Sequence, residues 1–150
     1  MTQAVVAGAL AVAALNALTA LFGGWCWYRG ESSRTFWILL RVGQGSVLVL
    51  AIMAGSLAAA GHYSTDDLFY LYALLPLAVG FVAEQLRSVS AQTILDRRGL
   101  PDAQAVGTLP EPEQRALVAA ILAREMGIMA LSALVVVFLA LRAAGTAHGF

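Results

Sequence analysis

The sequence contains no lysine, a single cysteine and two histidines, and only 12% of its 150 residues are charged. A soluble domain usually carries about 25% charged residues, so the low charge argues against a water-soluble fold. The nine arginines are balanced by nine acidic residues, which gives a formal net charge of zero. Because nucleic-acid binding usually needs a basic excess, we expect no nucleic-acid partner.

The scarcity of reactive side chains also limits the chemistry that the chain can perform. Cys26 has no second cysteine for an intramolecular disulfide, and His62 and His148 lie outside the apolar runs, where they cannot ligate a transmembrane haem. The sequence shows no phosphate-binding glycine loop, no zinc spacing and no Ser–His–Asp set. We therefore predict no cofactor and no metal, and a non-enzymatic role is favoured over an enzymatic one. The enzymatic alternative, which ranks third after the two non-enzymatic functions given below, is a lipid-modifying enzyme with Cys26, Ser88 and Ser90 as its candidate nucleophiles.

Apolar residues make up 60% of the chain and gather in four long runs. The runs cover residues 4–28, 35–60, 68–86 and 126–141. A helix of about 20 residues crosses the hydrocarbon core, and backbone polar groups in lipid must be satisfied within the segment. The sequence therefore predicts an all-α integral membrane protein, an up-down four-helix bundle that forms a single domain over residues 1–150.

The arginines predict how this bundle is oriented. Eight of the nine fall on one side of the predicted membrane, and only Arg142 falls on the other. The segment 61–67 between the second and third runs has two aspartates and no basic residue. By the positive-inside rule, we expect loops one and three to be cytoplasmic and both termini to lie outside the cell membrane.

The third and fourth helices are predicted to continue beyond the membrane as a cytoplasmic hairpin over about residues 87–125. The amphipathic stretch 85–98 ends in two arginines and Gly99, which is typical of a helix C-terminus. The next helix is expected to start near Glu113, where acidic residues and Pro112 suit a first turn. The segment 100–110 between them is predicted to be a loop. The hairpin either packs on itself or at the headgroups, or docks a partner protein.

Polar residues close to the cytoplasmic ends of the apolar runs form the candidate site. They are Arg41, Gln44, Glu84, Arg87, Arg124 and Glu125. Helical spacing allows Arg41, Glu84, Arg124 and Glu125 to meet in one layer. Two interpretations stay open: a neutral salt-bridge network that locks the helices, or a charge-lined site for a substrate, a proton or a lipid headgroup.

Two further polar residues, Asn16 and Thr19, lie within the first run at a spacing of three. Side chains of this kind in membrane helices often bond across to a neighbouring helix. We therefore expect Asn16 and Thr19 to join the first helix to another.

These patterns favour a scaffold or accessory subunit that acts as a homo-oligomer or within a larger membrane complex. The expected partners are the lipid bilayer and, through the hairpin, a second copy or another membrane protein. The alternative is a small transporter or channel that uses the charged cluster. Glu84 would then be the residue that exchanges protons, although Arg87 three residues later favours its charged form.

Overall fold

The computed structural model describes residues 2–149, and every regular element in that part of the chain is a helix. The four long helices are α1 (Thr2–Arg29), α2 (Arg34–Ala59), α3 (Leu68–Arg97) and α5 (Glu111–Thr146), and the short helix α4 (Ala103–Val106) lies between α3 and α5. Each long helix has the length and hydropathy needed to cross a membrane. The prediction of an all-helical chain with four long apolar helices is therefore confirmed.

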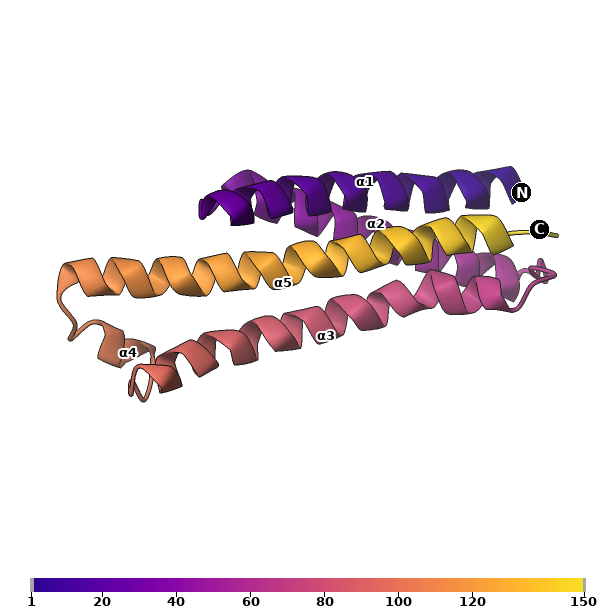
Figure 1. Ribbon diagram of the computed structural model, residues 1–150. Helices are drawn as coiled ribbons and strands as arrows, with labels where there is room; N and C mark the ends of the chain where they lie inside the picture. The colour runs from indigo at the N-terminus through magenta and orange to yellow at the C-terminus, as the bar shows by residue number, and fades with distance from the viewer. Residues whose placement is uncertain (1, 150) are drawn as a thin grey trace.

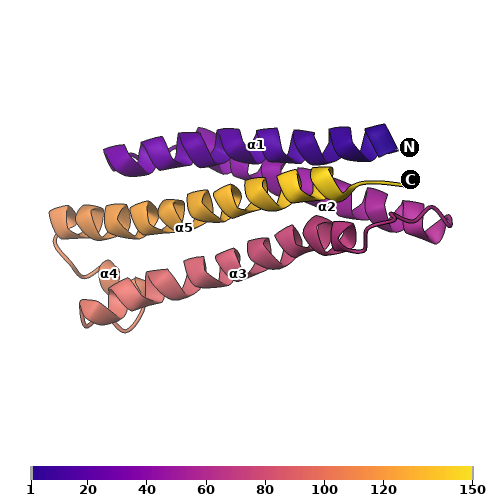
Figure 2. The ribbon, with the colours of Figure 1, turned by 45° about the vertical axis from the view of Figure 1, so that its right-hand side comes forward.

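The long helices lie side by side in one elongated bundle (Figures 1 and 2). α5 packs against both α1 and α3, and α1 also packs against α2. Contacts between α2 and α3 are sparser. The termini and the α2–α3 loop lie at one end, which we call the terminal end, and the α1–α2 loop and α4 lie towards the other, which we call the charged end (Figure 1).

The bundle places its small residues inside and many of its large apolar residues outside. Val5 and Ala9 are fully buried, whereas Leu21 is 74%, Phe81 66% and Phe138 63% exposed. Water would disfavour so much exposed apolar surface, while a bilayer solvates it. This distribution is typical of a multi-pass membrane protein.

Two core clusters join the helices. The cluster nearer the terminal end contains Phe69, and the cluster nearer the charged end contains Phe36; neither ring has any exposed surface. Most other core positions are alanine, valine or glycine, which let helix backbones approach closely. At Gly23 in α1, for example, an added Cβ would lie only 2.3 Å from the Phe36 ring.

At the charged end α3 and α5 extend beyond α1 (Figures 1 and 2). Ser90 and Leu95 of α3 and Leu117 of α5, which lie within the predicted hairpin, are buried. The predicted loop 100–110 is interrupted by α4, whose start is capped by Asp102: its Oδ1 accepts a bond of 2.8 Å from the Ala105 N–H. Four residues are too few to show helical periodicity, so only this cap could have indicated α4.

α5 is longer at its C-terminal end than the sequence predicted. It begins at Glu111, in the acidic first turn expected near Glu113, and it continues five residues past the end of the apolar run at Leu141. The last turn is held because Ala143 and Thr146 are buried and the Arg142 guanidinium lies 5.4 Å from the centre of the Tyr72 ring. Arg142 ends the apolar run, but the helix continues past it to Thr146.

The C-terminal segment is bound to the α2–α3 loop. The Ser64 hydroxyl lies within hydrogen-bonding distance of the carbonyls of Thr146 (3.2 Å) and His148 (3.1 Å), and the Thr65 N–H donates to the His148 carbonyl at 2.9 Å. Asp66, one residue before the N-cap position of α3, accepts a hydrogen bond from the Leu68 N–H at 3.0 Å. Within residues 2–149 the terminal end is thus closed by hydrogen bonds.

Candidate binding crevice

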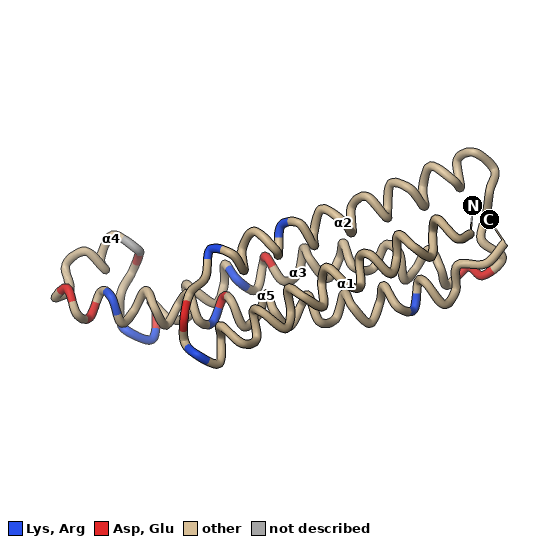
Figure 3. Tube along the Cα trace, turned by 90° about the horizontal axis from the view of Figure 1, so that it is seen from above, with Lys and Arg blue, Asp and Glu red and all other residues tan. Residues whose placement is uncertain are grey.

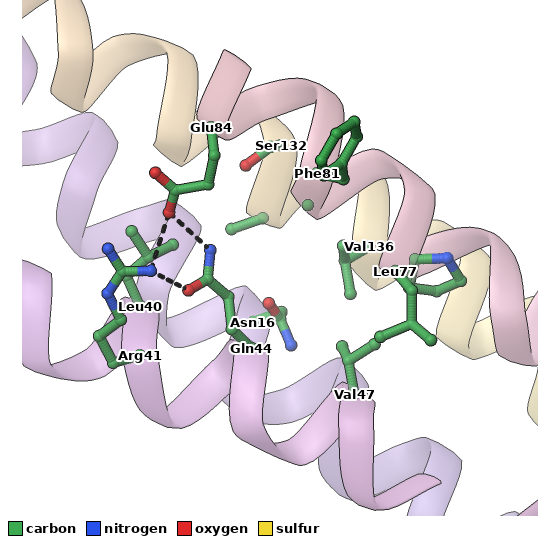
Figure 4. A pocket seen from close by; sticks show the side chains of 13 residues that line it. Asn16, Leu40, Arg41, Gln44, Val47, Leu77, Phe81, Glu84, Ser132 and Val136 are labelled. Carbon is green, nitrogen blue, oxygen red and sulfur yellow. Dashed lines mark hydrogen bonds and ion pairs between the residues drawn. The ribbon is translucent and has the colours of Figure 1, made fainter. Parts of the chain in front are cut away.

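Arg41 of α2 and Glu84 of α3 form a salt bridge between these two helices. Nη1 of Arg41 donates to Oε1 of Glu84 at 2.8 Å and to Oε1 of Gln44 at 2.6 Å. The Gln44 amide donates in turn to the same Glu84 oxygen at 3.4 Å (Figure 4). Gln44 lies one turn after Arg41, so both side chains leave α2 on one face and reach one carboxylate.

The other oxygen of Glu84 binds a second arginine. Nε of Arg87 lies 3.2 Å from Oε2 of Glu84, and the Arg87 guanidinium stacks 5.3 Å from the centre of the Trp37 ring. One carboxylate is therefore shared by two guanidinium groups. Glu84 is 29% exposed, Arg87 31% and Arg41 57%, so the cluster is only partly desolvated.

Of the six predicted site residues, Arg41, Gln44, Glu84 and Arg87 come together, and Arg124 and Glu125 do not join them. Within residues 2–149 neither Arg124 nor Glu125 forms a hydrogen bond or an ion pair with another side chain. The reason is the rotation of α5, which turns the neighbouring Met126 into the core cluster of Phe36. The expected layer of two arginines and two glutamates is thus not formed. The cluster that forms instead has two arginines and one glutamate, so its charges are not balanced.

The cluster closes one end of a crevice of about 250 Å³ between α2, α3 and α5 (Figure 4). Arg41, Gln44 and Glu84 supply its charged and polar end, while Leu77, Phe81 and Val136 are among its apolar walls. Asn16 of α1 and Ser132 of α5 add two smaller polar groups. The site can therefore hold a molecule with a polar end and an apolar body.

Asn16 and Thr19 were expected to form hydrogen bonds to another helix, but their side-chain hydrogen bonds stay within α1. The Asn16 amide donates to the Val12 carbonyl and the Thr19 hydroxyl to the Leu15 carbonyl, each at 2.9 Å within α1. In an apolar interior the carbonyl four residues earlier is the nearest acceptor, so these side chains satisfy themselves locally. Asn16 instead contacts α2 by packing, since a Cβ at Gly43 would lie 3.0 Å from its Oδ1.

The crevice ends inside the bundle. Val47 and Val136 line it and also belong to the core cluster at the terminal end. The polar lining therefore does not continue as a path along the whole length of the helices. This geometry suits a one-sided binding site better than a pore.

The candidate nucleophiles lie apart from the crevice lining. Cys26 is buried in the core cluster of Phe36, and the Ser90 hydroxyl donates to the Arg87 carbonyl at 3.1 Å. Among residues 2–149 no three His, Cys, Asp or Glu side chains gather in a way that could hold a metal ion.

Comparison with known proteins adds no relative, because no protein family, no curated protein and no solved structure matches the chain.

Proposed function

We propose that this chain is an up-down four-helix membrane protein with both termini outside and the charged end in the cytoplasm. The support is the charge distribution, since the charged end carries most of the basic residues and the terminal end only Arg142 (Figure 3). Arginines in short loops are retained on the cytoplasmic side during insertion.

The orientation predicts which loops react with a membrane-impermeant maleimide. In a Cys26→Ala background, Tyr63→Cys should react in intact cells because Tyr63 is 62% exposed in the α2–α3 loop. Ser32→Cys, in the exposed α1–α2 loop, should react only after the cells are permeabilised. Labelling of Ser32→Cys alone in intact cells would show that the orientation is the reverse.

We further propose that the protein is non-enzymatic and binds an amphipathic molecule taken from the bilayer. One observation carries this proposal: the Arg41–Gln44–Glu84 group lies at the end of an apolar crevice between α2, α3 and α5. The polar end of a ligand would lie against the Arg41–Gln44–Glu84 group, and its apolar part would lie along Leu77 and Phe81. The two functions expected from the sequence were a scaffold and a small transporter or channel. Lipid binding is closer to the transporter or channel, because it uses the charged cluster, but it does not require a pore.

Filling the crevice tests this function. A Cβ at Gly80, which lines the crevice, would have no atom within 4 Å, so Gly80→Leu adds volume there without a clash at the Cβ. Gly55→Leu is the matched control, because Gly55 is equally free but lies outside the crevice. A photoactivatable phospholipid with a diazirine in one acyl chain should label the peptides of Val47 and Val136 in the wild type, because these crevice residues are only 4% and 5% exposed. We expect Gly80→Leu to reduce this labelling about tenfold, the range of one well-placed apolar contact, and Gly55→Leu to leave it unchanged.

Equal labelling of both variants and the wild type would rule out the crevice as the ligand site. Mass spectrometry of the labelled peptides separates the crevice from ordinary lipid contact, because Leu21 and Phe138 are exposed on the bundle surface and are not crevice residues. Their labelling serves as the internal reference.

A scaffold or accessory subunit is the second candidate function. The observation that favours it is the extension of α3 and α5, an ordered helical hairpin beyond the predicted membrane whose residues Val89 and Val118 stay 61% and 47% exposed. We propose that a second copy or another membrane protein would bind there. If purification in mild detergent yields a monomer with no co-purifying protein, this candidate loses its support.

A further inference from the structure

Arg41 lines two surfaces at once. Its Nη1 binds Gln44 and Glu84 inside the crevice, while its Nη2 and Nε form no hydrogen bond with any residue among 2–149. In Figure 4 these two nitrogens lie on the side of the guanidinium away from the crevice. On that side Arg41 borders a shallow surface concavity together with Arg34, Trp37 and the apolar residues Ile38 and Val42.

This surface carries uncompensated positive charge. Arg34 is exposed and has no hydrogen bond or ion pair in the described chain, and Arg41 and Arg87 share the single carboxylate of Glu84. Three arginines and one glutamate leave an excess of two positive charges. At a membrane interface such an excess attracts anionic groups, and arginine favours phosphate because its planar donors match the phosphate oxygens.

The neighbouring side chains indicate which phosphate compound fits. Ile38 and Val42 lie beside the arginines and are 56% and 49% exposed. Trp37 lies next to them, and tryptophan side chains favour the level of the lipid headgroups. A soluble anion would gain nothing from these apolar surfaces, whereas a lipid would cover them with its acyl chains. Arg34 and Arg41 lie seven residues apart on one face, about 10 Å along the helix, so their long side chains can converge on one headgroup.

We propose that Arg34, Trp37 and Arg41 form a site for the phosphate group of an anionic phospholipid from the cytoplasmic leaflet. The proposal rests on the membrane placement proposed above and names the class of ligand that enters the adjacent crevice. The phosphate binds the free donors of Arg41 together with Arg34. One acyl chain lies along Ile38 and Val42, and the crevice on the other side of Arg41 can take the second.

The test is native mass spectrometry of the full-length protein from nanodiscs that contain equal amounts of phosphatidylglycerol and phosphatidylcholine. The wild type should retain phosphatidylglycerol preferentially. Arg34→Gln should reduce this preference roughly fivefold, the contribution of one basic residue near an anionic surface, and Arg34→Lys should restore most of it. Arg124→Gln is the matched control, because Arg124 is exposed on α5 near the same end of the bundle but lies outside the concavity.

An unchanged preference in Arg34→Gln would overturn the proposal, and so would an equal loss in Arg124→Gln. Loss of the wild-type preference in excess inorganic phosphate would show that the site binds a free anion and not a lipid. A co-purifying acidic protein that excludes the lipid would likewise overturn it. Because Arg34 does not line the crevice, the Gly80→Leu experiment tests crevice binding separately, so either idea can fail alone.

Discussion

Replacement of Gly23 by alanine is expected to lower the free energy of unfolding by about 3 kcal/mol, the upper range for an overpacked core. The added Cβ would lie 2.3 Å from Cε2 of Phe36 and 3.1 Å from the Cβ of Ala130, so α1 would have to move away from both α2 and α5. Phe36 has no exposed surface, which leaves its ring no space to rotate into. The measurement is reversible unfolding in mixed micelles with increasing dodecyl sulfate.

The neighbouring glycine provides the control for this experiment. A Cβ at Gly24 would have no atom within 4 Å, so Gly24→Ala should be neutral or stabilise the helix by up to about 1 kcal/mol. Both variants change the same residue type in the same helix, so helix propensity cannot explain a difference between them. Equal stability of the two variants would show that α1, α2 and α5 do not approach as closely as described.

Replacement of Glu84 by glutamine is expected to cost about 1–2 kcal/mol, measured in the same way. The change removes the negative charge that binds both Arg41 and Arg87, and hydrogen bonds to charged groups contribute about 1.5–3 kcal/mol when shielded. We discount this range because Arg41 is 57% exposed. A double-mutant cycle with Arg41→Gln should give a coupling energy of about 1 kcal/mol, which measures the contribution of the Arg41–Glu84 pair between α2 and α3 directly.

Glu111 offers the matched comparison, because it pairs with Arg115 one turn later on the same helix. Both side chains of that pair are more than 70% exposed, so Glu111→Gln should cost less than about 0.5 kcal/mol. If the two glutamates prove equally dispensable, the Arg41–Glu84 pair does not hold α2 and α3 together.

Much of the fold could be predicted because long apolar runs leave few alternatives to a helix. α3 begins at Leu68, where the third run begins, and α2 ends at Ala59, one residue before the predicted end of the second. The positions of Arg41 and Gln44 on one face of α2 also followed from spacing, because three residues nearly complete a helical turn.

Features that depend on the rotation of one helix against another could not be predicted. Spacing places Arg124 and Glu125 near the level of Glu84, but it does not say which face of α5 turns inward, and Met126 takes that place. The stacking of Arg87 on Trp37 was missed for the same reason, since it joins α3 to α2. The crevice lies between α2, α3 and α5, and the sequence contains no local signal for the sparse contacts between α2 and α3.

The central position of α5 has a consequence for how the protein is made. α1 and α3 both pack mainly on α5, which is synthesised after both of them. Before it arrives, α1 and α2 can pair, but α3 has only its sparse contacts with α2. Tertiary assembly therefore waits until α5 has been synthesised, and a chain truncated before Glu111 would leave α3 without its principal neighbour.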